Sequence, residues 1–193
     1  ALVSRNMSRA GDHMMDARYE YLGELVAERY KDRRAILIYD PDLPPTAMRL
    51  ESLKEGMGRN IQVVGEISLS TTDGDPVRRD AVWINDRLEL ASTCDVIIFL
   101  NPSPPEIDGM AILKKPETLR PAVLLADGYT GKLTREAVAS RRITMVVMVN
   151  PNPGEIPPGT TELGPIFSAK YVLLEERTMA DLLEKSPSLL AEK

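Results

Sequence analysis

The sequence predicts an α/β fold in which helices cover both faces of a mostly parallel sheet of five or six strands. Short apolar runs alternate along the chain with longer segments of helical periodicity, the pattern typical of successive βα units. The clearest run, residues 96–100, holds five consecutive apolar residues between an Asp and Asn101-Pro102. Because this run does not alternate with polar residues, we expect a strand buried on both faces at the centre of the sheet.

The composition indicates a globular chain with a sizeable core. The 193 residues are 43% hydrophobic and 27% charged, with a net charge of −5. An acidic chain of this kind is a poor candidate for binding nucleic acid. The single cysteine, Cys94, excludes an internal disulfide framework, and its place before a buried strand predicts an inert core thiol. No apolar run approaches the length of a membrane span, and we expect one lobe over residues 1–176 with a helix or tail over 177–193.

The first half of the chain alternates helix and strand. Apolar or aromatic side chains recur every three or four residues from Met15 to Tyr30, which predicts a helix over residues 14–30. The following segments read in turn as strand, helix, strand and helix; their ranges are 35–40, 46–57, 61–69 and 77–92.

The second half continues the alternation after the central strand. We expect a short helix at 106–115, a strand at 122–127, a helix from about 130 to 140 and a strand at 141–150. Residues 151–165 hold five prolines and three glycines, which predicts a loop. Residues 167–176 are the last strand candidate, and a helix or tail follows from Thr178.

Short polar residues end four of the predicted strands. They are Asp40, Asn101, Asp127 and Asn150. In an open parallel sheet the carboxyl ends of the strands meet at one edge, where ligands bind. Asn offers donors and acceptors and Asp offers acceptors, so this row predicts a site for a polar ligand rather than for a reaction. The alternative is that these side chains cap turns or helix starts, as Asn and Asp often do.

No motif in the sequence indicates a catalytic, metal or cofactor site. The one histidine, His13, lies far from Cys94, so neither a Cys-His pair nor a mixed metal site is expected. The glycine-containing segment 128–134 lacks the spacing of a phosphate loop, and no dinucleotide-binding motif follows a strand. Asp40 and Asp42 are similar to the acidic magnesium pocket of receiver domains, but Asn101 and Asn150 stand where that pocket needs Asp and Lys.

These strands resemble the carboxy-terminal lobe of type I periplasmic sugar-binding proteins, the ribose-binding and LacI-like group. The segment CDVIIFLNP is similar to the family's strand ending in Asn-Asp, so Asn101 matches and Pro102 departs. AVLLADG is similar to its strand ending in Phe-Asp-Gly, which matches Asp127, and MVVMVN places Asn150 where the family has Gln or Asn. Thr46 stands in the helix turn where the family often places an Arg on the sugar.

The resemblance implies a flavodoxin-like lobe with strand order 2-1-3-4-5 that binds a small sugar-like ligand and catalyses nothing. The implied protein is a solute-binding protein of an ABC transporter or a sensor, in the periplasm or in the cytoplasm, completed by an amino-terminal lobe or a second copy. The implied ligand-binding residues are Asn101, Asp127, Asn150, Asp40 and Thr46. Two other functions stay open: a flavodoxin-like hydrolase using Asp40 and Asp42, and an interaction module that shares its site with another chain.

Overall fold

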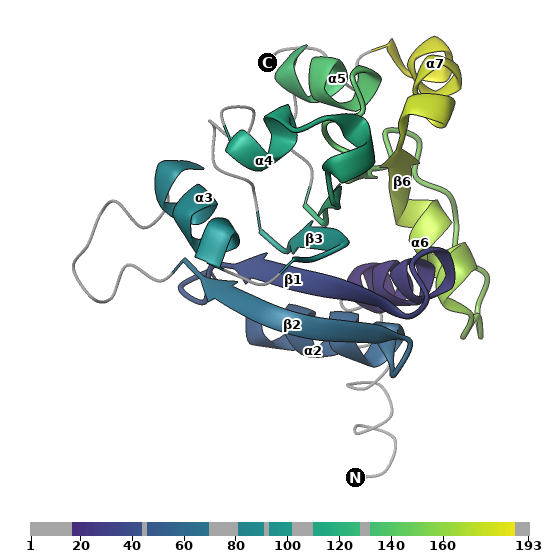
Figure 1. Cartoon of the computed structure of the whole chain (residues 1–193). Helices are drawn as coiled ribbons and strands as arrows, with labels where there is room; N and C mark the ends of the chain where they lie inside the picture. Colours follow the sequence, from purple (N-terminus) through teal and green to yellow (C-terminus); the bar gives the residue numbers. More distant parts are fainter. Residues whose placement is uncertain are drawn as a thin grey trace, which may run out of the picture.

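The computed structural model shows a six-stranded sheet between two layers of helices (Figure 1). It describes residues 17–43, 46–69, 81–90, 93–101, 110–127 and 132–187. The strands lie in the order β2-β1-β3-β4-β5-β6, and β6 alone runs antiparallel to its neighbour. Their bounds are β1 Arg33–Tyr39, β2 Ile61–Ser68, β3 Val96–Phe99, β4 Ala122–Leu125, β5 Met145–Val149 and β6 Tyr171–Leu174. The predicted three-layer fold and strand order are confirmed.

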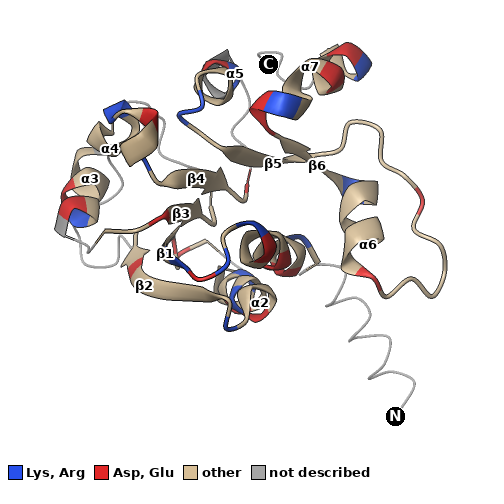
Figure 2. Ribbon diagram, turned by 45° about the vertical axis from the view of Figure 1, so that its right-hand side comes forward, with Lys and Arg blue, Asp and Glu red and all other residues tan. Residues whose placement is uncertain are grey.

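The helices divide between the two faces of the sheet. A helix at residues 17–29, α2 (Thr46–Met57) and α6 (Leu163–Lys170) pack on one face. The other face carries α3 (Ala81–Leu90), α4 (Ala111–Lys114), α5 (Lys132–Ala139) and α7 (Glu176–Lys185), with the short 3-10 helix η3 (Glu117–Leu119) beside α4. In Figure 2 most charged residues lie on helices, connections and the outer strands β1 and β2, whereas β3, β4 and β5 carry none. All four residues of β3 are buried, as the unbroken apolar run predicts.

Two glycines let the helix at 17–29 and α2 pack backbone against backbone. A Cβ atom added at Gly56 would overlap the carbonyl oxygen of Glu20 and lie 2.9 Å from the Glu24 nitrogen. A Cβ added at Gly23 would overlap the Leu53 carbonyl oxygen. Gly56 lies in the last turn of α2, where its role is this close approach, and Gly58, at a φ of +54°, follows the end of α2 in the left-handed region.

The clearest difference from the predicted elements lies before β6. Residues 163–170 form α6, where the sequence predicts the end of a loop and the start of a strand. Pro165 is compatible with a helix because it lies in the first turn, where no backbone N–H is needed. Phe167 holds the helix against the sheet, with its ring centroid 4.6 Å from that of Tyr21 and 5.5 Å from that of Tyr171.

Most other boundaries agree to within two residues where they can be compared, but β5 begins at Met145, four residues later than the predicted start at Arg141. α2 has the predicted bounds, and α7 begins two residues earlier than predicted and packs Met179 and Leu182 against the core. The predicted starts of four helices, together with His13, Pro102 and Gly128, lie outside the described residues. The helix starts concerned are residues 14–16, 77–80, 106–109 and 130–131.

We expect Gly56→Ala to destabilise the fold, because its methyl group would push two helix backbones apart. Overpacking of this kind outweighs the gain in helix propensity and should lower the free energy of unfolding by about 1–3 kcal/mol. Gly164→Ala is the matched control, since a Cβ there would lie 3.6 Å from Tyr21 Cε2, an ordinary contact. Urea unfolding measures both, and equal stability of the two variants would contradict the close packing.

Candidate functional site: the carboxyl edge of the sheet

The register of the central strands brings three of the predicted site residues to one level. Ile38 of β1 pairs with Phe99 of β3, and Phe99 pairs with Leu125 of β4. Two positions beyond these paired residues, at the carboxyl ends of the three strands, stand Asp40, Asn101 and Asp127. The strands therefore present three polar residues side by side, as parallel neighbours that end together must.

Asn101 joins the ends of β1 and β3 to the start of α2. Its Oδ1 accepts the Asp40 N–H at 2.7 Å, and its Nδ2 donates to Thr46 Oγ1 at 3.2 Å. Thr46 Oγ1 in turn donates to the Asp40 carbonyl at 2.8 Å. Asn101 is only 3% exposed, so these bonds satisfy polar groups that water cannot reach. The amide keeps one Nδ2 hydrogen beyond these two bonds.

Asp40 caps a turn of the segment that follows β1. Its Oδ1 accepts the Asp42 N–H at 3.0 Å, and the residue is buried. A buried carboxylate engaged with the Asp42 backbone does not present the exposed acid pair that the hydrolase alternative needs. Within the described residues there is no group of three or more His, Cys, Asp or Glu that could hold a metal ion. Burial raises the pKa of the half-buried Cys94 thiol, which disfavours a nucleophilic role.

Arg18 stands in the middle of this edge, and the sequence reasoning missed it. Its Nη1 lies 3.3 Å from Asp127 Oδ1, and its Nη2 donates to the Tyr19 hydroxyl at 2.6 Å. The guanidinium carbon lies 4.6 Å from the ring centroid of Tyr19 and 5.0 Å from that of Tyr171. Arginine favours such aromatic faces because its planar cation is weakly hydrated.

The burial of Arg18 distinguishes it from a surface arginine. The residue is 9% exposed, and its Nε is buried without a hydrogen-bond partner in the described part of the chain. The Asp127 side chain beside it keeps 32% of its surface exposed. A sequence signal existed, because Arg18 shares the four-residue spacing of Leu22 and Val26 and so places a charge on the apolar face of its helix.

Tyr19 connects this pair to β3. Its hydroxyl lies 3.4 Å from the Leu100 carbonyl oxygen, to which it donates. Burial raises the pKa of Tyr19, with nearby Arg18 and Arg49 opposing the shift, so the phenol is protonated at neutral pH. The side chain that the sequence assigns to the core thus also fixes Arg18 at the edge.

Asn150 lies at the same edge but further along the strand direction. Leu125 pairs with Val146 of β5, so Asn150 extends two positions beyond the level of Asp127. Its Nδ2 donates to the Ser168 carbonyl at 3.1 Å, and its Oδ1 accepts the Asn152 N–H at 2.9 Å. Asn150 therefore fastens β5 to the last turn of α6, and it is only half-buried.

The connections beside this edge are largely outside the described residues. The segments outside the description are 44–45, 70–80, 102–109 and 128–131, which follow β1, β2, β3 and β4 along the chain. A cavity of about 550 Å³ opens instead at the amino-terminal edge, on the opposite side of the sheet.

No helix among the described residues has the length and apolarity to cross a membrane.

The fold is that of one lobe of the sugar-binding solute-binding proteins of ABC transporters. One similar structure is a solute-binding protein from Burkholderia graminis in complex with D-arabinose: TM-score 0.53 at 14% identity, over 83% of this chain and 60% of that one. Another is the arabinose-binding protein AraP from Geobacillus stearothermophilus, with a TM-score of 0.55 at 10% identity over 85% and 63%. A third is a periplasmic solute-binding protein from Actinobacillus succinogenes with bound D-allose. Its TM-score is 0.51 at 13% identity, over 88% of this chain and 62% of that one.

The likeness to these proteins is one of fold. No family model matches the sequence, and no curated protein matches it. This chain spans only about three fifths of the length of the three solved structures. The resemblance to a periplasmic-binding-protein lobe is confirmed at the level of fold.

We expect Asn101→Ala to destabilise the protein, because it leaves the buried Asp40 N–H without an acceptor. An unsatisfied buried group of this kind costs about 1–3 kcal/mol in the free energy of unfolding. Asn150→Ala is the control and should cost about 1 kcal/mol or less, since water can reach its partners. Urea unfolding measures both, and an Asn101→Ala protein as stable as the wild type would show that the amide does not hold the strand ends.

Proposed function

We propose that this chain binds a small neutral sugar at the carboxyl edge of its sheet and performs no reaction on it. The observation that carries the proposal is the Arg18–Asp127 pair, which combines buried donors with a partly exposed acceptor beside the aromatic ring of Tyr171. The structural neighbours solved with D-arabinose and D-allose support the choice of ligand class.

The pair suits a ligand with neighbouring hydroxyl groups. Each hydroxyl can donate to Asp127 and accept from Arg18, so two adjacent hydroxyls satisfy a carboxylate and a guanidinium together. Two of the five N–H groups of Arg18 have protein partners in the described part of the chain. The Tyr171 ring provides apolar surface of the kind that ligand sites combine with a few polar groups.

The other predicted site residues take two proposed roles. Asn101, Asp40 and Thr46 are buried and hold the strand ends and α2 in place. Asn150 marks the limit of the site towards α6, where it orders the chain between Ser168 and Asn152.

A second lobe or a second copy of the chain should complete the site. High affinity for a small ligand generally requires that most of its surface be buried, and one edge of a sheet cannot enclose a sugar. Near this edge the side chains of Leu43 and Met48 are exposed, and Val149 at the end of β5 is 70% exposed. We propose that an amino-terminal lobe or a second copy covers them. The proposed place of action is extracytoplasmic, as part of an ABC transport system, or cytoplasmic if the lobe belongs to a regulator.

The test is a thermal-shift screen with neutral pentoses and hexoses, including D-arabinose and D-allose, followed by calorimetry. We expect at least one sugar to raise the melting temperature of the wild-type protein. Asp127→Asn should then weaken binding by about tenfold or more, because it removes a charge-assisted acceptor of roughly 1.5–3 kcal/mol.

Glu51→Gln is the control for this variant, since it removes an exposed carboxylate on α2 and should bind as the wild type does. The proposal fails if no sugar stabilises the wild-type protein, or if Asp127→Asn binds the sugar with unchanged affinity.

A further inference from the structure

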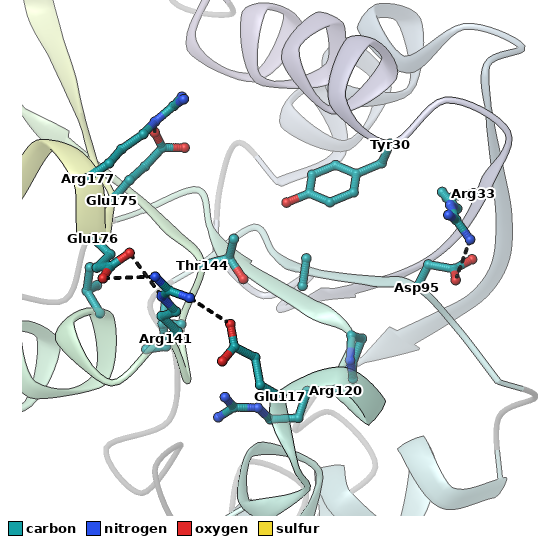
Figure 3. Close-up of a pocket in the computed structure, with 14 residues that line it drawn as sticks. Tyr30, Arg33, Asp95, Glu117, Arg120, Arg141, Thr144, Glu175, Glu176 and Arg177 are labelled. Atoms are coloured by element: carbon teal, nitrogen blue, oxygen red, sulfur yellow. Dashed lines mark hydrogen bonds and ion pairs between the residues drawn. The ribbon is translucent and has the colours of Figure 1, made fainter.

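A cavity of about 550 Å³ lies at the amino-terminal edge of the sheet, away from the proposed sugar site (Figure 3). Its size is within the range of small-molecule sites. Segments distant in sequence build it: the end of the helix at 17–29, the starts of β1, β3, β4 and β5, η3, the end of α5 and the start of α7. Its apolar lining comes from Tyr30, Pro121, Ala122, Val138 and Ile143.

Every carboxylate that lines the cavity has an arginine partner. Arg141 is the most engaged, since its Nε lies 3.0 Å from one oxygen of Glu176 and its Nη1 lies 3.1 Å from Glu117. Glu175 has two partners, Arg29 and Arg177. The remaining pair is Arg33 with Asp95 at 3.6 Å. These pairs neutralise the acids of the rim, so the cavity is not an acidic pocket.

Arg120 is the lining arginine without such a partner. Its Nη1 donates to the Leu113 carbonyl oxygen at 3.1 Å, and no carboxylate among the described residues pairs with it. Its Nε is buried and has no hydrogen-bond partner there. The guanidinium brings to the cavity a positive charge that no carboxylate there compensates, and such a charge beside apolar walls favours an anion.

Tyr30 lines another wall of the cavity and supplies a second donor (Figure 3). Its hydroxyl has no hydrogen bond within the described part of the chain, although the side chain is largely enclosed. Burial raises the pKa of the phenol, with Arg29 opposing and Glu175 adding to the shift, so the group carries its proton at neutral pH.

We propose that this cavity is a second binding site, for a small carboxylic acid with an apolar body. The carboxylate binds Arg120 and the Tyr30 hydroxyl, and the hydrocarbon part packs against Pro121, Val138 and Ile143. The single uncompensated arginine supplies one positive charge, which matches a monoanion better than a doubly charged phosphate ester. This site is independent of the proposed sugar site, which lies at the other edge of the sheet.

The test is calorimetric titration with cyclohexanecarboxylate and with cyclohexanemethanol, its uncharged analogue of similar size. For the wild-type protein we expect the acid to bind about tenfold or more tightly than the alcohol, the effect of one charge-assisted hydrogen bond. Arg120→Gln should remove this preference, so that the two compounds bind alike. Arg87→Gln on α3, which removes an exposed arginine stacked on Trp83, should leave the preference unchanged.

Tyr30→Phe keeps the test decisive if Arg120→Gln does not fold, because the hydroxyl it removes has no partner in the described residues. This variant should bind the acid about three- to tenfold more weakly, since one neutral hydrogen bond contributes about 0.5–1.5 kcal/mol. Its affinity for the alcohol should be nearly unchanged. Absence of acid binding to the wild-type protein overturns the proposal. So does an acid preference that survives both Arg120→Gln and Tyr30→Phe.

Discussion

The matched register of three buried parallel strands is the constraint on which the rest of the structure depends. Because β1, β3 and β4 are paired in step and covered by helices on both faces, they leave the core at the same level. A slip of one residue in β3 would turn its side chains to the other face and move Asn101 away from Asp40. The fold and the candidate site therefore have one origin, the packing of the buried apolar segments of these three strands.

The polar residues at this edge form a buried structural network and, beside it, the pair that we propose binds a ligand. Asn101, Thr46 and Asp40 bond to one another in a buried network, which closes the joint between two strands and α2. Asp127 keeps part of its surface exposed beside the buried Arg18, and the helix at 17–29 holds Arg18 there because Gly23 and Gly56 let it approach α2 closely. The proposed ligand site and the helix packing are thus linked through the first helix.

The sequence could predict the sheet because unbroken apolar runs such as residues 96–100 need burial on both faces. It could also predict the row of strand-end residues, since parallel strands share one polar edge. It could not predict Arg18, because helical periodicity assigns that face to the core and says nothing of a charge buried by aromatic rings. It assigned 163–170 to loop and strand because Pro165 reads as a breaker unless the helix start is known. The cavity at the amino-terminal edge was beyond sequence reasoning, since segments from Tyr30 to Arg177 meet there only through the fold.

The central claim is that ligand recognition belongs to the carboxyl edge of the sheet. A titration of the ¹⁵N-labelled protein with the sugar that stabilises it most, followed by amide NMR, locates the bound ligand directly. We expect the largest shift changes at the amides of Arg18, Asn101 and Asp127, at the ends of β3 and β4. Changes concentrated instead at Arg120, Thr144 and Glu176, at the opposite edge, would contradict the claim.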